Sequence, residues 1–354
     1  MKKYLHKRPF ELESGAILPE IEIAYHTYGN LNSAGDNVVW VCHALTANSD
    51  VFEWWKGLFG ETDLFNPNAY FIVCDNVLGG CYGTTGPLSM NPLSGKAYYH
   101  DFPFITIRDI VGAHDLLRKE LGIQKIAVGV GGSLGGQQML EWNIGSPELF
   151  ENTILIATNA VHSPWGIAFN EAQRMAIQSD PTWNLATKRA GIAGLKAARA
   201  IALLSYRNYE AYRLKQSEDD QDMILGFKAA GYQQYQGKKL IDRFNSYTYW
   251  RLSAAMDSHH VGRKRNGLKN ALKNIQARVL IIGIKDDILF PNEEQRLLAN
   301  EIPDSEFQLV TSDFGHDGFL IETEKLSQII SDFLNSESNE NEVLTENNKI
   351  EVEV

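Results

Sequence analysis

The sequence contains no apolar run approaching about 20 residues, the length that a membrane-spanning helix requires. We therefore expect no transmembrane segment and no membrane partner. The opening segment, MKKYLHKRPFELESG, carries positive charge but lacks the apolar stretch of a secretory signal, so we do not expect it to direct export.

Cysteine is scarce, since the chain has only Cys42, Cys74 and Cys81. Three cysteines do not make a disulfide framework, and two of them lie in or at the end of apolar runs that predict strands. This usage favours a reducing compartment, and we expect a cytoplasmic protein. No group of cysteine and histidine residues has the spacing of zinc ligands, so the sequence predicts no metal site.

A basic stripe is also missing, which disfavours nucleic acid as a partner. The formal net charge is −11, and the last eighteen residues, with six glutamates and one lysine, contribute −5 of it. That acidic and polar composition is typical of disorder, so we expect residues 336–354 to form a disordered tail.

What is present is the composition of an ordinary globular protein, with 44% hydrophobic and 22% charged residues. A chain of 354 residues can bury a sizeable core, in one large α/β domain or in two domains. Apolar runs with β-branched residues predict strands at 22–27, 38–43, 70–74, 125–130, 153–157, 278–284 and 306–310. Helical periodicity predicts helices at 107–121, 134–144, 292–301 and 322–334.

Strands that alternate with helices predict a mostly parallel, doubly wound sheet. The strand at 278–284 is almost continuously apolar, as expected for a parallel strand that is covered on both faces. The alternation stops after residue 164, and the next hundred or so residues have helical character with no convincing strand. We expect an α/β core, 1–164 and 271–335, with a helical lid insertion, 165–270, that shapes a pocket and excludes water. The alternative is a helical subdomain used only for dimer contacts, and both roles can coexist.

Glycines crowd around one serine between a predicted strand and a predicted helix, in the stretch Gly131-Gly132-Ser133-Leu134-Gly135. Glycines at such a place often mark only a turn, or cradle a phosphate. The phosphate-binding pattern G-x-G-x-x-G is broken here by a leucine, and no phosphate-loop lysine follows. The better match is G-x-S-x-G, in which the serine occupies a strained strand-to-helix turn and exposes its Oγ as a nucleophile.

A serine nucleophile needs a base, and the base needs an orienting acid. In α/β-hydrolase sheets these residues follow the serine in the order acid, then histidine. Asp286 and Asp287 follow the predicted strand 278–284, and His316 follows the strand 306–310, so the order predicts a triad with either aspartate as its acid. The oxyanion hole needs two backbone N–H groups, which we assign to Leu134 and to Leu45 in the loop after strand 38–43.

Five blocks of the sequence resemble the homoserine O-acetyltransferase family, the α/β-hydrolase-fold acyltransferases of methionine biosynthesis. They are CHALT at 42–46, DNVLGGCYGTTGPLSMNP at 75–92, FPFITIRDIV at 102–111, GGSLGGQQMLEW at 131–142 and GHDGFL at 315–320. The resemblance covers about residues 8–335. This chain departs from the usual family pattern at Leu134, where methionine is usual, at His114, where an amide is frequent, and at His260, where aspartate is often found.

The resemblance implies Ser133 as nucleophile and His316 as base. It selects Asp287 over Asp286, because the family's acid stands directly before an x-Leu-[Phe/Tyr]-Pro element.

The resemblance also implies a set of substrate-binding residues. Arg199 matches the family's substrate arginine on a lid helix, and Tyr206 lies two helical turns further along the same face. Asp317 follows the catalytic histidine, and Thr46 adds a hydrogen bond to substrate in this interpretation.

The implied reaction is a ping-pong acyl transfer from acetyl-CoA to the hydroxyl of L-homoserine through a Ser133 acyl-enzyme. Arg199 would bind the homoserine carboxylate and Asp317 its ammonium. Acetyl-CoA is then a co-substrate, no cofactor is tightly bound, and the family implies a homodimer.

Three alternatives remain open. The same fold and triad could use succinyl-CoA or accept serine, or could act as a plain esterase. A catalytically silent binding or scaffold protein belongs to a different class and is disfavoured, because all three members of the triad are present in order.

Overall fold

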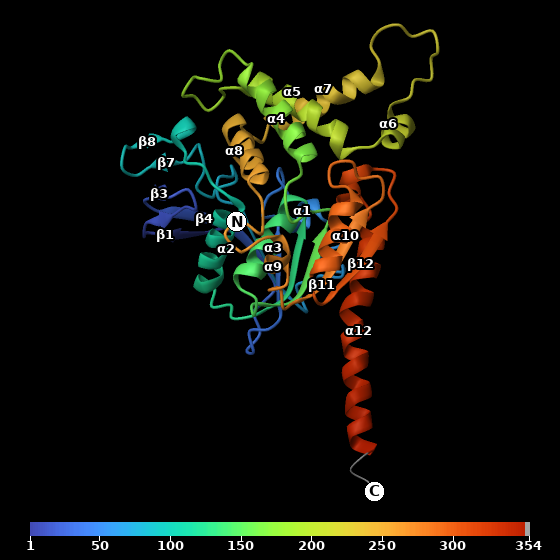
Figure 1. Cartoon of the computed structure of the whole chain (residues 1–354). Helices are drawn as coiled ribbons and strands as arrows, with labels where there is room; N and C mark the ends of the chain where they lie inside the picture. Colours follow the sequence, from blue (N-terminus) through green and yellow to red (C-terminus); the bar gives the residue numbers. More distant parts are fainter. Residues whose placement is uncertain (351–354) are drawn as a thin grey trace.

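The computed structural model describes the backbone of residues 1–350 and the side chains of residues 1–336. Its centre is an eight-stranded sheet (Figure 1). The strand order is β1 (Lys2–His6), β4 (Ile21–Tyr28), β6 (Phe71–Asp75), β5 (Val38–Cys42), β9 (Ile126–Gly132), β10 (Phe150–Ile156), β11 (Arg278–Ile284) and β12 (Ser305–Val310). The strands from β6 to β12 run parallel, and β1 and β4 are antiparallel to their neighbours.

This arrangement confirms the predicted α/β-hydrolase fold, and all seven predicted strands are present within a few residues of their expected bounds. The edge strand β1 was missed. Its residues, KKYLH, are mostly exposed or half-buried, so the segment lacks the apolar run by which the other strands were found. Pairing with β4, from Lys2 opposite Tyr25 to His6 opposite Ile21, is what makes it a strand.

The core lies on both faces of the sheet. In β5, Val38, Trp40 and Cys42 belong to one buried cluster, whereas Val39 and Val41 belong to the other. Such a strand is apolar at every position because helices cover both of its sides. The helices of the core are α1 (Val51–Trp54), α2 (Ile107–Glu120), α3 (Leu134–Gly145), α10 (Asn292–Glu301), α11 (Gly318–Ile321) and α12 (Thr323–Ile350), and η2 (Gly315–Asp317) is a 3₁₀ turn.

Helices fill the chain between β10 and β11. They are α4 (Pro164–Gln178), α5 (Ile192–Tyr206), α6 (Tyr209–Gln216), α7 (Lys228–Ile241), α8 (Ser246–Asp257) and α9 (Leu268–Leu272). Figure 1 shows α4 to α8 gathered above one end of the sheet, while α9 returns to the core and contacts α10. We refer to α4 to α8 as the lid. The assignment of 165–270 as a separate insertion stays a prediction.

The remaining elements are short. Two small ribbons pair β2 (Phe10–Glu11) with β3 (Ile17–Leu18) and β7 (Met90–Asn91) with β8 (Lys96–Ala97), and η1 (Tyr99–Asp101) follows them. The backbone of α12 continues as far as Ile350. The tail predicted to be disordered, 336–354, falls almost wholly outside the described side chains, so that expectation stays a prediction. Within the described chain, no helix combines the length and the apolarity needed to cross a bilayer.

Candidate active site

Ser133 occupies the turn between β9 and α3, as the glycine-rich motif predicts. Its backbone has φ +57° and ψ −125°, a region that residues other than glycine rarely adopt. The glycines beside it allow close approach of the backbones. A Cβ on Gly131 would lie 2.3 Å from the carbonyl oxygen of Gly135, and one on Gly135 would lie 2.0 Å from that of Cys42. The turn thus holds the serine side chain at the carboxyl end of the central strand.

His316 lies beside this serine, although 183 residues separate them in the chain. Its Nε2 is 3.0 Å from Ser133 Oγ, and its side chain is buried in η2, directly after β12. The ring of Phe290 stacks on the imidazole with centroids 5.1 Å apart, and Phe319 lies 5.2 Å away. These rings restrict the orientation of the histidine, which lies within hydrogen-bonding distance of the serine hydroxyl.

Asp287 completes the arrangement from the loop after β11. Its Oδ2 lies 2.7 Å from His316 Nδ1, and its Oδ1 accepts hydrogen bonds from the backbone N–H groups of Leu289 (2.8 Å) and Phe290 (2.9 Å). The adjacent Asp286 is exposed. The structure therefore brings Asp287, rather than Asp286, to the histidine. With the carboxylate accepting from Nδ1–H, the Nε2 lone pair faces the serine hydroxyl.

The surroundings of His316 favour its protonated form. Burial lowers the pKa of this imidazole, but the charge of Asp287, its hydrogen bond and the charge of Asp317 raise it, and the net pKa is above its ordinary value. A raised pKa is useful in a general base, because the imidazole readily takes the proton of a nucleophile as it attacks.

The two residues assigned to the oxyanion hole, Leu45 and Leu134, lie just after the carboxyl ends of two neighbouring parallel strands, β5 and β9. The register pairs Cys42 of β5 with Gly131 of β9, and Leu45 and Leu134 each follow their strand residue by three positions. Leu134 is the first residue of α3, so its N–H has no partner within the helix and is free to donate elsewhere. The structure thus brings both backbone segments beside Ser133, and their role in binding an oxyanion stays a prediction.

Arg199 extends from α5 of the lid toward the triad. Its guanidinium lies over the ring of Tyr206, 5.2 Å from the ring centroid, and Tyr206 in turn lies 5.9 Å from the His316 ring. The Nη1 atom of Arg199 is buried and has no hydrogen-bond partner among the described residues. A buried guanidinium nitrogen with no acceptor is costly, which suggests that a ligand supplies the acceptor.

Asp317 is already paired with a residue that sequence reasoning missed. Its Oδ2 lies 2.9 Å from Nε of Arg207, which directly follows the last residue of α5. Burial raises the pKa of Asp317, while Arg207, Arg199 and His316 lower it, and the net pKa is above its ordinary value. In the sequence, the only indication that Arg207 belongs to the site was its position next to Tyr206. Its pairing with Asp317 depends on how the lid packs against η2.

Thr46 lies in the loop after β5, partly exposed. The structure gives it a backbone contact, in which its carbonyl oxygen accepts from Nη1 of Arg243 at 2.5 Å. Arg243 also donates to the hydroxyl of Tyr82 at 2.5 Å, so it ties the chain between α7 and α8 to the core. The proposed contact of Thr46 with substrate stays a prediction.

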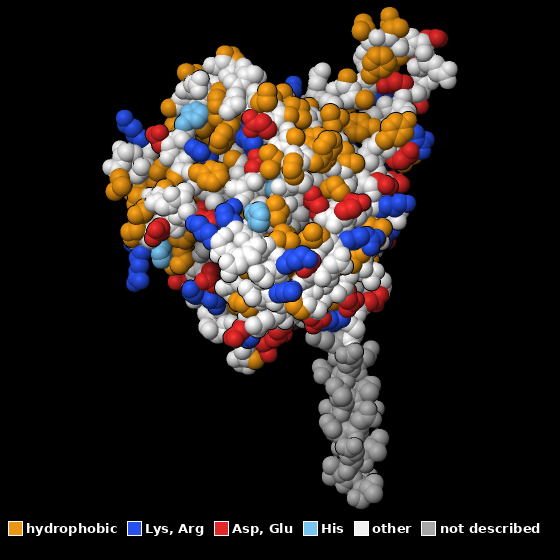
Figure 2. Space-filling model, viewed as in Figure 1, with side chains coloured by type: hydrophobic (Ala, Val, Ile, Leu, Met, Phe, Trp, Pro, Cys, Tyr) orange, Lys and Arg blue, Asp and Glu red, His pale blue; other side chains and the backbone are white. Residues whose placement is uncertain are grey.

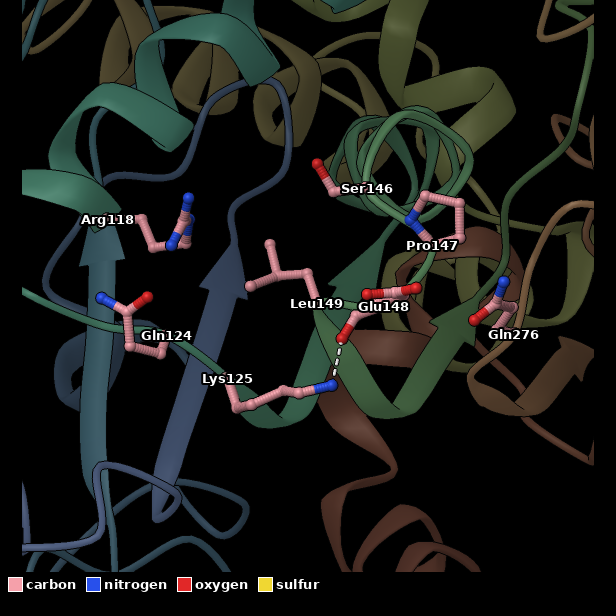
Figure 3. Close-up of a pocket in the computed structure, with 8 residues that line it drawn as sticks. All are labelled: Arg118, Gln124, Lys125, Ser146, Pro147, Glu148, Leu149 and Gln276. Atoms are coloured by element: carbon pink, nitrogen blue, oxygen red, sulfur yellow. Dashed lines mark hydrogen bonds between the residues drawn. The ribbon is translucent and has the colours of Figure 1, made fainter.

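A surface pocket lies at the opposite end of the sheet (Figure 3). Its lining includes Lys125, Leu149 and Gln276, which precede β9, β10 and β11, whereas Ser133 follows β9. Lys125 Nζ donates to the carbonyl oxygen of Glu148 at 2.5 Å across this pocket. It therefore has no part in the chemistry of the triad. Within the described residues, no group of three or more histidine, cysteine, aspartate or glutamate side chains could hold a metal ion.

Comparison with known proteins identifies relatives that match over most of the chain. Residues 37–323 match the family model of the alpha/beta hydrolase fold. A homoserine O-acetyltransferase from Cyclobacterium marinum is 51% identical over 322 residues, which cover 91% of this chain and 92% of that protein.

Solved structures agree on the fold. A homoserine O-acetyltransferase from Bacillus anthracis superimposes with a TM-score of 0.87 at 24% identity, over 94% of this chain and 97% of that one. Esterase E22 superimposes almost as well, with a TM-score of 0.85 at 22% identity, over 94% of this chain and 99% of that one. Since a transferase and an esterase share this architecture, the fold alone does not select the acceptor.

Proposed function

The chain belongs to the homoserine O-acetyltransferase family of the α/β-hydrolase fold, and on that premise we propose that it transfers the acetyl group of acetyl-CoA to the hydroxyl of L-homoserine. The protein is an acyltransferase. We assign the chemistry to Ser133, His316 and Asp287, and the product, O-acetylhomoserine, serves methionine biosynthesis.

In the first half-reaction, Ser133 Oγ attacks the carbonyl carbon of the thioester. Its proton passes to His316 Nε2, 3.0 Å away, and Asp287 stabilises the imidazolium that forms. The backbone N–H groups of Leu134 and Leu45 donate to the oxyanion. The C–S bond then breaks, the thiolate takes the proton from His316, and CoA leaves with the acetyl group on Ser133.

In the second half-reaction, His316 accepts the proton of the homoserine hydroxyl as that oxygen attacks the acetyl-enzyme. The ester bond to Ser133 breaks and the serine recovers its proton from His316. Water competes for the same intermediate. The helices above the triad limit its access, which gives the lid a direct part in choosing transfer over hydrolysis.

One observation carries the choice of homoserine as acceptor, namely the buried Nη1 of Arg199 without a hydrogen-bond partner beside the triad. A carboxylate matches the planar fork of a guanidinium. On the other side, Asp317 can receive an ammonium with the lone pairs that Arg207 leaves free. Tyr206 and Thr46 complete the proposed acceptor site.

An esterase is the second candidate, because esterase E22 shares the fold with a TM-score of 0.85. An esterase needs no cation in the acceptor site. The two functions therefore differ in what the pair of Arg199 and Asp317 does.

The decisive experiment measures thiol release with acetyl-CoA and with succinyl-CoA, each with L-homoserine, with L-serine and with water alone, and identifies products by mass. Beyond a single-turnover burst, we expect sustained thiol release only with acetyl-CoA and homoserine together, and O-acetylhomoserine as the product. Equal release without an acceptor, with acetate as product, would identify an esterase. Faster turnover with succinyl-CoA or serine would reassign the donor or the acceptor.

The acyl-enzyme itself is tested by mixing acetyl-CoA with protein in the absence of acceptor. Intact-protein mass should increase by one acetyl group, and Ser133→Ala should stay unlabelled while keeping its far-UV circular dichroism. An acetylated Ser133→Ala protein would exclude Ser133 as the nucleophile.

Two further assignments follow the family. The free thiols of Cys42, Cys74 and Cys81 fit a reducing compartment, and we place the protein in the cytoplasm. We also propose a homodimer in which a second copy covers apolar side chains of the lid. Figure 2 shows hydrophobic atoms gathered at the lid end of the molecule. Tyr209 in α6 and Leu225 between α6 and α7 are among the most exposed apolar residues of the described chain. Light scattering of Leu225→Asp should then report a monomer.

A further inference from the structure

A fully buried histidine that takes no part in the triad contacts α3, the helix that follows the nucleophile. His114 of α2 is 0% exposed, and both of its ring nitrogens have partners. Its Nδ1 lies 2.6 Å from Oδ2 of Asp75, the last residue of β6, and its Nε2 lies 2.9 Å from Oε1 of Gln138 on α3. Among the described residues, the other carboxylate oxygen of Asp75 has no hydrogen-bond partner, so the carboxylate interacts through this histidine.

The amide of Gln138 has only one possible orientation. Its Nε2 donates to two carbonyl oxygens, that of Leu134 at 3.0 Å and that of His43 at 3.2 Å. Carbonyl oxygens only accept, so the amide nitrogen must face them and Oε1 must face His114. The Nε2 of His114 is therefore the donor, and Gln138 is held from one side while it holds two backbone segments on the other.

Those two segments carry the proposed oxyanion hole. Leu134 follows the nucleophile directly, and His43 lies two residues before Leu45. His43 is itself fixed, because its Nδ1 lies 2.8 Å from the carbonyl oxygen of Ala44 and its Nε2 accepts from the N–H of Val77 at 3.2 Å. Burial lowers the pKa of His43 to about 4, so it stays neutral in that tautomer.

The neighbours of His114 favour its charged form, in which Nδ1 donates to Asp75 and Nε2 donates to Gln138. Burial lowers the pKa of His114, but Asp75, Gln138 and Asp115 raise it, and the net pKa is above its ordinary value. The other titratable groups near this site are the thiols of Cys42 and Cys74, which burial keeps neutral by raising their pKa. The rings of Trp40 and Trp142 contact the imidazole and exclude water from it.

We propose that Asp75, His114 and Gln138 form a positioning relay, in which the histidine orients the glutamine and the glutamine fixes the two backbone segments that carry the oxyanion-hole amides. The inference rests on the proposed acyl transfer at Ser133. None of the three side chains contacts a reacting atom, so they are positioning residues. They act by holding the N–H groups of Leu45 and Leu134 in place for the charge that develops in the transition state.

The test removes the donors of Gln138 and compares the binding of two acetyl-CoA analogues. A trifluoromethyl ketone analogue adds to Ser133 and forms an oxyanion, whereas a thioether analogue forms none. For Gln138→Met we expect kcat to fall about 10–100-fold, less than the loss of a whole oxyanion-hole donor. The Ki of the ketone should rise by the same factor, while the Kd of the thioether and the KM for homoserine stay within about twofold.

Asn143→Leu is the matched control. Asn143 is a buried amide on the same helix, and it bonds to Met139 and Thr153 rather than to the oxyanion loops. It should lower Tm as Gln138→Met does and leave kcat unchanged. His114→Gln is the conservative variant, since its amide nitrogen can still donate to Oε1 of Gln138, and it should keep kcat within about threefold of wild type.

Several outcomes would overturn the relay. They are a folded Gln138→Met enzyme with kcat within twofold of wild type, an equal loss of affinity for both analogues, or an Asn143→Leu variant that loses as much activity. If Gln138→Met does not fold, Gln138→Glu is used instead, because it keeps the size of the side chain while removing its donors. The same thresholds for kcat and for the affinities of the two analogues then decide the test. Absence of transfer in the wild-type protein would refute the proposed function instead, so the two failures are distinguishable.

Discussion

Nε of Arg207 lies 2.9 Å from Oδ2 of Asp317, so the carboxylate that follows the proposed catalytic base already has a cationic partner. Asp317 also lies within the electrostatic influence of Arg199 and His316. The proposed acceptor site is thus a network in which Asp317 interacts with both Arg207 and Arg199 before any substrate binds. It is not a simple pair of one free cation and one free anion.

This pairing predicts a specific defect in Arg207→Gln. Without the nearby cation, the pKa of Asp317 rises further, and a smaller fraction of the carboxyl is ionised to bind an ammonium. The KM for homoserine should increase by roughly 10-fold, or about 1.4 kcal/mol of binding free energy, and the increase should grow as pH falls. Steady-state kinetics across pH 6–9 measure it. Arg213→Gln, which removes an exposed ion pair with Glu210, is the control and should have no effect.

The acid of the triad gives a second prediction. Asp287→Asn should lower kcat by ~10⁴, the loss found when an amide replaces the orienting carboxylate of a serine triad and favours the wrong tautomer of the histidine. Asp286→Asn should stay within about twofold of wild type, because Asp286 is exposed. Thiol release under saturating acetyl-CoA compares the two variants directly. Similar losses in both, or the reverse ranking, would mean that the other carboxylate orients His316.

Arg199 separates a transferase from a hydrolase. Arg199→Lys keeps the positive charge but loses the planar fork that matches a carboxylate. Transfer to homoserine should fall ~10–100-fold, on the order of 1.4–2.8 kcal/mol, while the first burst of thiol release stays nearly unchanged. The ratio of O-acetylhomoserine to acetate in the products should fall as water competes better. A variant with an unchanged ratio, or one that has lost the burst, would argue that Arg199 does not bind the acceptor.

The raised pKa of His316 sets the pH dependence of acylation. Because the base must be neutral to accept a proton, the burst rate should fall as pH drops through a pKa above the ordinary value for histidine. Asp317 contributes to that raised pKa, so Asp317→Asn should move the acidic limb of the profile to lower pH. Stopped-flow thiol detection without acceptor measures this limb separately from acceptor binding. A limb that stays in place or moves to higher pH would contradict the assignment.

Much of the proposed site was predictable because local sequence imposes it. The turn at Ser133 requires small residues on both sides, and the glycines at positions 131 and 135 therefore indicate such a turn from the sequence alone. Strand β11 is almost continuously apolar because helices cover both faces, and this allowed Asp286 and Asp287 to be placed directly after a buried strand. The order of serine, acid and histidine then followed from the topology of the sheet.

The tertiary structure alone decided the contacts between segments that are far apart in the chain. The choice of Asp287 over Asp286 required the family resemblance at the sequence level, whereas in space it follows from which carboxylate reaches His316, 29 residues away. Nothing local to Arg207 indicates Asp317, and nothing local to His114 indicates Asp75 or Gln138. Strand β1 is likewise a strand because β4 is available to pair with it. Local sequence determines backbone conformation through sterics and periodicity, but partners of buried charges depend on how separate elements pack, and a single sequence does not record that packing.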